Sequence, residues 1–276
     1  FKQKTAYEIM PSLVGSEMCI RDRALTLGRS HAKESGFTLG TLAEAIPSKH
    51  PQILVKGNEA ISLGATAANL ECYVGYPISP ATTILVWMER NLVSEGKFVY
   101  QVSSEIEAIA SLLGAAFAGK KAMTATAGPG ISLMSEGLGL AWMAEIPAVV
   151  VDVQRGGPAT GLPTKTEQSD LFACMHPAHG DVKLPIIAPG TVEECFYAAV
   201  TALNWSERYQ GPVIILSEMA LSERQQNIPK PNVEDLNIEN RLVYQGDNGY
   251  QRYDSLDVSP MPIPGGAVSY THLTLP

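Results

Sequence analysis

The sequence predicts an α/β fold in which a parallel β-sheet is flanked by helices. Short apolar runs alternate with longer helical patterns between residues 57 and 217. The run at 148–151 is apolar at every position, which is typical of a strand buried on both faces. A Gly-Pro-Gly turn at 128–130 joins one such run to a helical pattern. Strands that alternate with helices favour a parallel sheet covered on both faces.

The expected elements follow each other in chain order. Pro80 is expected in the first turn of a helix, where proline is tolerated. Ser103 or Ser104 is expected to begin another helix, and a further helix follows the turn at 128–130. The remaining expected helices cover residues 57–70, 166–174 and 191–209, and the expected strands cover residues 72–76, 98–101, 122–126, 148–153, 184–188 and 212–217. The short apolar run at 98–101 is expected to be a buried strand.

The domain organisation is predicted from changes in composition. Residues 1–23 and 267–276 resemble translated sequencing-adapter reads, and we interpret both as artefacts, with genuine termini as the alternative. Residues 24–50 hold an expected short amphipathic helix at 37–46, closed by Pro47, and a linker. Residues 51–219 form the expected α/β domain, and the proline-containing, charged stretch 220–266 is expected to be a linker.

Composition excludes several classes of function. The chain has 20 basic and 28 acidic residues and a net charge of −8, which argues against a nucleic-acid-binding surface. Its apolar runs are far shorter than a membrane span. Cys72, Cys174 and Cys195 form no C-x-x-C pair, so we expect inert, buried thiols in a reducing cytoplasm. His176 and His179 lack a partner at metal-ligand spacing, so no metal site is predicted.

Two glutamates of one predicted helix have different expected roles. Glu107 stands three residues after Ser104, the spacing of a capping box, so a structural role explains it. Glu105 shares a helix face with the apolar residues Ala108, Ile109, Leu112 and Ala116. A carboxylate on that face is either a first-turn residue favoured by the helix dipole or a functional group in a dry site. Periodicity alone leaves both possibilities open.

Several polar or small residues directly follow predicted strands. Ser79, Glu105, Gly128 and Arg155 each do so, and parallel sheets bind ligands at the carboxyl ends of their strands. The turn at 128–130 would allow a ligand to approach the backbone closely, although it matches neither G-x-G-x-x-G nor a P-loop. A loop rich in glycine presents Arg155, whose guanidinium is suited to binding a carboxylate or to a salt bridge across the loop.

Four motifs together resemble a known family. These are Tyr-Pro-Ile-Ser-Pro at 76–80, Ser-Glu at 104–105, Thr-Ala-Thr-Ala-Gly-Pro-Gly at 124–130 and Val-Gln-Arg-Gly-Gly-Pro at 153–158. They are similar to the thiamine-diphosphate pyrimidine-binding domain of 2-oxoacid:ferredoxin oxidoreductases, and most of all to the alpha subunit of the 2-oxoglutarate type. The run at 161–171 fits the same subunit, and the resemblance covers residues 56–264.

The resemblance implies a cofactor and roles for individual residues. Glu105 would hydrogen-bond N1′ of the thiamine diphosphate pyrimidine, with further cofactor contacts from Pro77, Thr126, Gly128 and Gly130. Ser79 and Arg155 would bind the substrate, with Arg155 on its carboxylate. The implied reaction is the oxidative decarboxylation of a 2-oxoacid to an acyl-coenzyme A, with electrons passed to ferredoxin. Ser79 replaces a usual Thr and Ala81 a common Ser, so substrate preference is the least transferable feature.

The resemblance also implies partners. The chain lacks the Gly-Asp-Gly…Asn pattern that binds Mg²⁺ and diphosphate, which the family places on a separate beta subunit together with [4Fe–4S]. The chain is therefore expected to be half of an active site, in a heterodimer or a dimer of heterodimers. Residues 24–50 resemble the end of a truncated gamma-like domain, and residues 220–266 resemble the passage toward a truncated second domain.

Two other interpretations stay open. The chain could be the pyrimidine module of another thiamine enzyme, although the motifs at 76–80 and 154–158 disfavour this. Detecting reduction of ferredoxin rather than of lipoamide would separate the two. The second is a non-catalytic α/β binding subunit, for which loss of Glu105 or Arg155 would have been evidence.

Overall fold

The computed structural model describes residues 16–36, 40, 43–44 and 47–244, and the chain divides into two units at residues 48 and 49. In the first unit, helix α2 (Ser16–Glu34) runs across the expected artefact boundary at residue 23. Gly40, Ala43 and Glu44 are not helical, and the rest of the helix expected over 37–46 lies outside the described residues. The expected tail 267–276 also lies outside them.

A six-stranded parallel sheet forms the centre of the second unit, as predicted. Its strand order is β3-β2-β4-β5-β7-β6, and every pairing within it is parallel. The strands are β2 (Cys72–Gly75), β3 (Phe98–Gln101), β4 (Ala122–Thr126), β5 (Ala148–Gln154), β6 (Ile186–Ile187) and β7 (Pro212–Glu218). The central strands β4 and β5 are buried along their whole length, because helices cover both faces.

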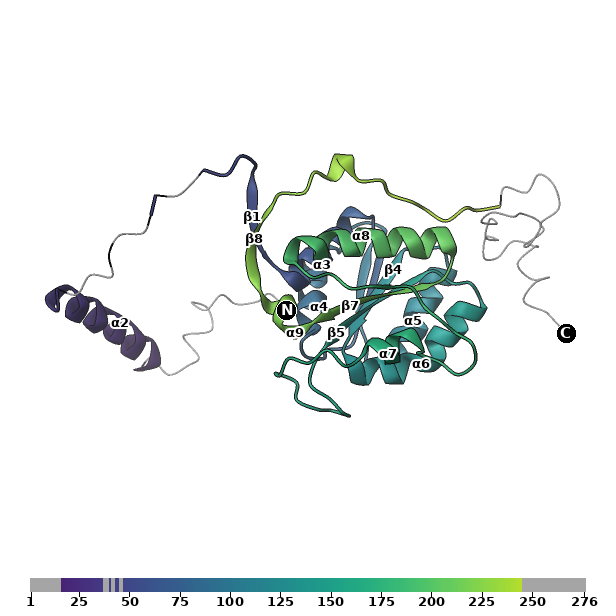
Figure 1. Ribbon diagram of the computed structural model, residues 1–276, viewed down its shortest axis with the longest axis horizontal. Helices are drawn as coiled ribbons and strands as arrows, with labels where there is room; N and C mark the ends of the chain where they lie inside the picture. Colours follow the sequence, from purple (N-terminus) through teal and green to yellow (C-terminus); the bar gives the residue numbers. More distant parts are fainter. Residues whose placement is uncertain (1–15, 37–39, 41–42, 45–46, 245–276) are drawn as a thin grey trace. The chain divides into compact units, whose positions relative to one another are not determined.

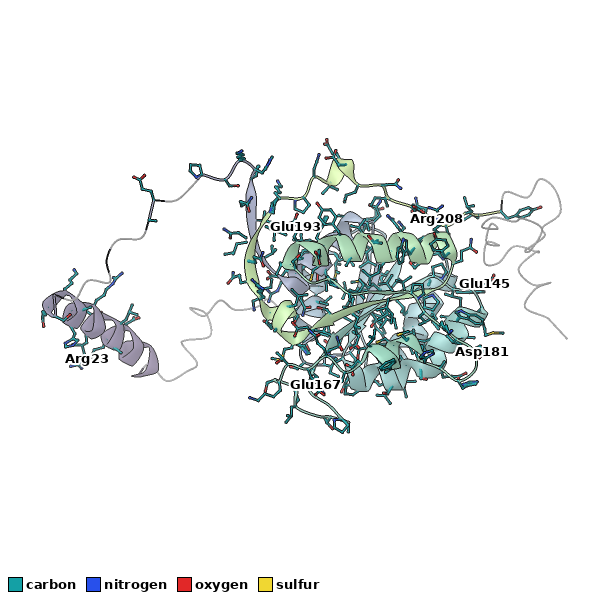
Figure 2. All side chains as sticks on the ribbon, in the orientation of Figure 1. Arg23, Glu145, Glu167, Asp181, Glu193 and Arg208 are labelled. Carbon is teal, nitrogen blue, oxygen red and sulfur yellow. The ribbon has the colours of Figure 1, made fainter. Side chains whose placement is uncertain are left out.

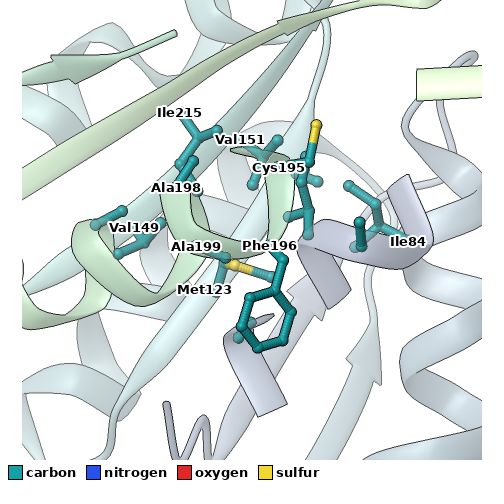
Figure 3. Close-up of a cluster of buried hydrophobic side chains, with 14 of the residues drawn as sticks. Ile84, Met123, Val149, Val151, Cys195, Phe196, Ala198, Ala199 and Ile215 are labelled. Atoms are coloured by element: carbon teal, nitrogen blue, oxygen red, sulfur yellow. The ribbon is translucent and has the colours of Figure 1, made fainter. Parts of the chain in front are cut away.

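One face of the sheet is covered by helices α3 (Gly57–Ala67), α4 (Thr82–Asn91) and α8 (Val192–Tyr209). Figure 1 shows these helices on the side opposite α5 to α7. The core on this face is continuous, and Figure 3 shows parts of it contributed by β4 (Met123), β5 (Val151) and α8 (Phe196 and Ala199). Helix α3 approaches α8 closely at Gly64, where an added Cβ would overlap the Phe196 carbonyl oxygen.

The other face is covered by helices α5 (Glu105–Phe117), α6 (Gly128–Met143) and α7 (Leu171–Met175). Helices α5 and α6 pack closely because Gly137 of α6 leaves room for Ile109 of α5. Thr124, Thr126 and Asp152 are also buried on strands β4 and β5. Polar groups therefore lie inside this layer, next to the carboxyl ends of the central strands.

A short antiparallel ribbon lies outside the main sheet. Strand β1 (Gln52–Lys56) pairs with strand β8 (Gln225–Pro229), so the segments that precede and follow the α/β unit lie side by side. Helix α9 (Met219–Glu223) precedes β8, and the short 3₁₀ helix η1 (Val233–Asp235) follows it. None of these elements was predicted from the sequence, whose composition favours a linker from residue 220.

Several expected elements differ in detail from the structure. Strand β3 is at the sheet edge and largely exposed, so the expectation of a buried strand at 98–101 was wrong. Helix α4 begins at Thr82, after Pro80, and its N-cap is Ala81. Helix α3 ends at Ala67, and α7 and β6 are shorter than expected. The other strands and α8 agree with expectation to within one residue.

Candidate functional site

The carboxyl ends of four neighbouring strands carry the candidate site residues. Ser79 follows β2, Glu105 follows β3, Gly128 follows β4 and Arg155 follows β5, and these strands are adjacent in the sheet. The four residues therefore lie along one edge of the sheet, as predicted. In the described residues they form two groups, one around Glu105 and one around Arg155. Contacts of Asp170 connect the two groups.

Glu105 and Glu107 have the different surroundings that the helix periodicity predicted. Ser104 caps helix α5, since its Oγ accepts a hydrogen bond of 3.2 Å from the Glu107 N–H. The Glu107 carboxylate accepts from the N–H and hydroxyl of Ser103, at 2.8 and 2.6 Å, so the reciprocal bond goes to Ser103 instead of Ser104. These Ser103 hydrogen bonds lower the pKa of Glu107.

Glu105 is only 5% exposed, although it is the first residue of α5. Its carboxylate has no hydrogen bond or ion pair within the part of the chain that the structure describes. Burying a carboxylate without a partner is costly. A group that donates a hydrogen bond to this carboxylate would therefore be bound favourably.

Gly130 makes the close contact between Glu105 and the end of β4 possible. A Cβ at Gly130 would lie 2.8 Å from Glu105 Cγ and would overlap Thr126 Oγ1. Three predicted cofactor residues, Glu105, Thr126 and Gly130, therefore meet at the start of α6. Pro77 is exposed in the turn between β2 and α4.

Arg155 and Ser79 form the second group. Arg155 is 5% exposed, and its Nη1 donates a hydrogen bond of 2.6 Å to the Ser79 carbonyl. Its Nη2 donates to the Thr160 carbonyl at 2.9 Å, while Nε is buried without a partner. No carboxylate pairs with this guanidinium among the described residues. The salt bridge across the loop, the alternative raised from sequence, is therefore absent from this region.

Asp170, which was not predicted from the sequence as a site residue, joins the two groups. Its carboxylate oxygens would lie 2.6 and 2.8 Å from a Cβ at Gly128, so the carboxylate rests against the first residue of α6. The Asp170 N–H donates to Gln154 Oε1 at 3.0 Å, and Gln154 Nε2 donates to the Ser217 carbonyl at 3.1 Å. Gln154 immediately precedes Arg155, so this side chain links the arginine loop to the glycine turn.

Burial shifts the protonation of the carboxyl groups below this edge. Burial, followed by the nearby Asp170 carboxylate, raises the pKa of Asp152 well above its ordinary value. Burial and the charge of Glu167 raise the pKa of Asp170. Glu167 lies on the loop that follows β5, where it accepts a hydrogen bond from the Gly157 N–H at 2.9 Å (Figure 2).

Cys72, Cys174 and Cys195 are buried free thiols, as predicted. Burial raises the pKa of both Cys72 and Cys195 to about 12, so neither is a reactive thiolate. Cys174 Sγ donates to Asp152 Oδ2 at 3.4 Å, and burial raises the pKa of this thiol too.

Within residues 16–36, 40, 43–44 and 47–244, no three His, Cys, Asp or Glu side chains gather in a way that could hold a metal ion. None of the helices there combines the length and the apolar character that crossing a membrane requires.

A parallel sheet with small and polar residues at its carboxyl edge is the architecture of an α/β ligand-binding domain. A family model described as pyruvate flavodoxin/ferredoxin oxidoreductase, thiamine diphosphate-binding, matches residues 63–274, and the chain belongs to this family. The resemblance and the α/β fold predicted from sequence are thereby confirmed.

Two relatives are similar to this chain over most of its length. The chain is 42% identical over 184 residues to 2-oxoglutarate synthase subunit KorA of Methanocaldococcus jannaschii. This alignment covers 66% of this chain and 50% of that protein. The chain is 36% identical over 226 residues to the alpha subunit of 2-oxoacid:ferredoxin oxidoreductase 1 of Aeropyrum pernix, covering 79% of this chain and 35% of that one. The chain thus spans at most about half the length of these relatives.

A solved structure is similar over almost the whole chain. It is 2-oxoglutarate:ferredoxin oxidoreductase from Magnetococcus marinus, with 2-oxoglutarate, coenzyme A and succinyl-CoA bound. The TM-score is 0.81 at 41% identity, and the match covers 96% of this chain and 48% of that chain.

Proposed function

We propose that this chain is the pyrimidine-binding part of the alpha subunit of a 2-oxoacid:ferredoxin oxidoreductase that acts on 2-oxoglutarate. The complete enzyme would convert the 2-oxoacid to an acyl-coenzyme A and pass electrons to ferredoxin. The names of the similar KorA subunits support the substrate, and the coenzyme A in the similar structure supports the acceptor. The free thiols support our proposal of a cytoplasmic location.

The observation that carries the proposal is the buried, unpartnered carboxylate of Glu105 beside Thr126 and Gly130. Thiamine diphosphate supplies, when bound, the electron sink that lets a 2-oxoacid lose its carboxyl group. Glu105 would share a proton with N1′ of the pyrimidine through a hydrogen bond. This bond would offset the cost of burying the carboxylate, and Gly130 would leave room for the ring.

Arg155 supports a substrate that carries a carboxylate. Its guanidinium is buried without an anionic partner in the described region, and its Nε has no hydrogen bond. A buried cation is stable only when it is paired, so an incoming carboxylate would be bound strongly. The Ser79 side chain is exposed at the same edge, so its hydroxyl is available to the same ligand.

Asp170 supports our proposal that the diphosphate and Mg²⁺ are held by a beta subunit. Its carboxylate lies against Gly128 at the start of α6, where a helix N-terminus would otherwise favour an anion. A diphosphate at this position would meet a carboxylate, so the turn is better suited to the uncharged ring. We therefore propose a heterodimer, or a dimer of heterodimers, with [4Fe–4S] on the partner.

Glu105→Gln tests the proposal in the complex of the full-length alpha subunit with its beta subunit. We expect the exchange of the C2 proton of bound thiamine diphosphate to fall by about 10²–10⁴-fold, the usual contribution of a catalytic proton-transfer group. Glutamine still hydrogen-bonds, but it is a much poorer proton acceptor. Proton exchange is followed by NMR, beside the melting temperature.

Glu107→Gln is the matched control, two residues further along the same helix. It removes a carboxylate that only bonds Ser103, so it should lower the melting temperature slightly and leave C2 exchange unchanged. Fast exchange in Glu105→Gln would refute the role of Glu105. A comparable loss in folded Glu107→Gln would assign the proton transfer to Glu107.

A further inference from the structure

Asn58, the second residue of helix α3, is buried at the same edge of the sheet and belongs to none of the motifs discussed above. It is 1% exposed, and its Nδ2 donates hydrogen bonds to the Pro80 carbonyl at 3.0 Å and to Thr83 Oγ1 at 2.8 Å. Its Oδ1 is buried without a partner. A buried amide that is only half satisfied persists where its remaining hydrogen bonds are needed for a specific geometry.

Asn58 and Arg155 hold consecutive carbonyls of one turn. Arg155 reaches the Ser79 carbonyl from the end of β5, and Asn58 reaches the Pro80 carbonyl from α3. The turn between β2 and α4 is therefore fixed from two sides by different elements. Ser79 is held through its own carbonyl and is followed directly by the anchored Pro80, so the position of its exposed side chain depends on both anchors.

The start of α3 is itself fixed. A Cβ at Gly57 would overlap the carbonyl oxygen of Leu221 in α9, so the backbones of these segments are in contact. Ser62 Oγ donates to the Asn58 carbonyl at 2.8 Å, and the Glu59 side chain accepts from the Lys56 N–H at 2.8 Å. Because the backbone at Asn58 is fixed in this way, its side-chain hydrogen bond to the Pro80 carbonyl holds the turn in one position.

We propose that Asn58 is a positioning residue that holds the turn at residues 79–80, and with it the Ser79 hydroxyl, in place for the substrate. This inference rests on the proposed function for the substrate contact of Ser79, whereas the anchoring of the turn stands on the geometry alone. Asn58 does not touch the reacting atoms. Its loss would weaken substrate binding and leave the proton transfer at Glu105 intact.

The first test measures amide hydrogen exchange in the full chain. Asn58→Asp keeps the shape of the side chain but replaces the donor with an acceptor that faces the Pro80 carbonyl. We expect exchange in peptides covering residues 76–83 to rise by about tenfold, the effect of losing one buried hydrogen bond. Asn58→Ala should give the same result without a new charge. Exchange in β4 reports whether each variant is folded.

Thr66→Ala is the control, because it removes a comparable hydrogen bond, from Thr66 Oγ1 to the Ser62 carbonyl, further along α3 without touching Asn58 or the turn. It should leave exchange at residues 76–83 unchanged. Equal exchange in wild type and in both folded Asn58 variants would overturn the proposal, as would an equal rise in Thr66→Ala.

The second test separates this inference from the proposed function. In the complex with the beta subunit, Asn58→Ala should raise KM for 2-oxoglutarate about tenfold and leave C2 proton exchange unchanged. An unchanged KM would overturn the substrate role of Asn58. A wild-type complex that converts no 2-oxoacid would refute the proposed function, and the exchange data would then decide the anchoring of the turn by themselves.

Discussion

At the scale of single residues, buried carboxyl groups divide into two kinds. Glu105 is 5% exposed at the carboxyl edge of the sheet, and its carboxylate has no hydrogen-bond or charge partner among the described residues. Asp152, on strand β5, is completely buried. Asp152 has one acceptor contact, from the Cys174 thiol, and its Oδ1 has none. The two groups should therefore respond differently to substitution.

Asp152 should make stability depend on pH. Burial raises the pKa of its carboxyl group, so the folded chain keeps this proton at pH values where the unfolded chain, with an ordinary pKa near ~3.9, has lost it. Its contribution to stability is fully present below the unfolded pKa. It is lost as pH rises through the folded pKa, with a slope of up to about 1.4 kcal/mol per pH unit.

Asp152→Asn should remove this part of the pH dependence. The free energy of unfolding, measured with urea between pH 5 and pH 8, should fall less with pH in the variant than in wild type. Asp181→Asn, at an exposed position, is the control and should follow wild type (Figure 2). Parallel curves for wild type and Asp152→Asn would contradict the prediction.

The environment of a residue could be predicted from the sequence where it depends only on the spacing of neighbouring residues along a helix. The separate environments of Glu105 and Glu107 follow from their positions on one helix. Asn58, Gln154 and Asp170 could not be found in this way. Each is defined by a hydrogen bond or contact with a residue far along the chain, and an isolated polar residue in the sequence gives no sign of such a partner.

At the scale of elements, glycines decide how closely helices approach. Gly64 of α3 lies against the backbone of α8 at Phe196, whereas Gly114 of α5 has no atom within 4 Å of an added Cβ. The same substitution should therefore have opposite effects at the two positions.

Gly64→Ala should destabilise the chain by about 1–3 kcal/mol, because the new methyl group forces α3 away from α8. Gly114→Ala is the matched control and should stabilise it by about 0.5–1 kcal/mol, because alanine loses less backbone entropy in a helix. Both are measured by urea unfolding. A neutral or stabilising Gly64→Ala would show that the crossing is not tight.

Strands could be predicted from the sequence where they are buried along their whole length, because such strands are apolar. Strands β4, β5 and β7 are nearly continuous apolar runs, and their expected bounds agree with the structure to within one residue. Strand β8 is largely exposed and mostly polar, so no apolar pattern marks it. Strand β1 contains only three consecutive apolar residues between two polar ones, a run too short to indicate a strand by itself. Strand β3 was recognised by its apolar residues, but its place at the edge depends on strand order, which the local pattern does not contain.

At the scale of the whole α/β unit, the segment after η1 is attached to helices that are distant in sequence. Arg241 and Glu207 of α8 form a buried ion pair at 2.5 Å, with side chains 9% and 3% exposed. Arg241 also donates to the carbonyls of Ala116 and Lys120 at the end of α5, at 2.6 and 3.0 Å. One side chain thus connects helices on opposite faces of the sheet.

Arg241→Ala should destabilise the unit by about 3–5 kcal/mol, because it leaves the buried Glu207 carboxylate without its charge partner. Arg208→Ala removes an exposed ion pair with Glu239 and should cost about 1 kcal/mol or less. Thermal and urea unfolding of both variants measure the difference. Equal losses would show that the Arg241 contacts are replaced by water.

The β1–β8 ribbon has a mechanical consequence. Its strands are antiparallel with Gln52 opposite Pro229, and the Lys230 N–H donates to the Pro51 carbonyl at 2.8 Å. A pulling force applied through Pro51 and Lys230 would act at the open end of the ribbon. It would load these hydrogen bonds one after another, as in unzipping, instead of all together, as in shear. The ribbon would therefore yield at low force, while the parallel sheet behind it stays intact.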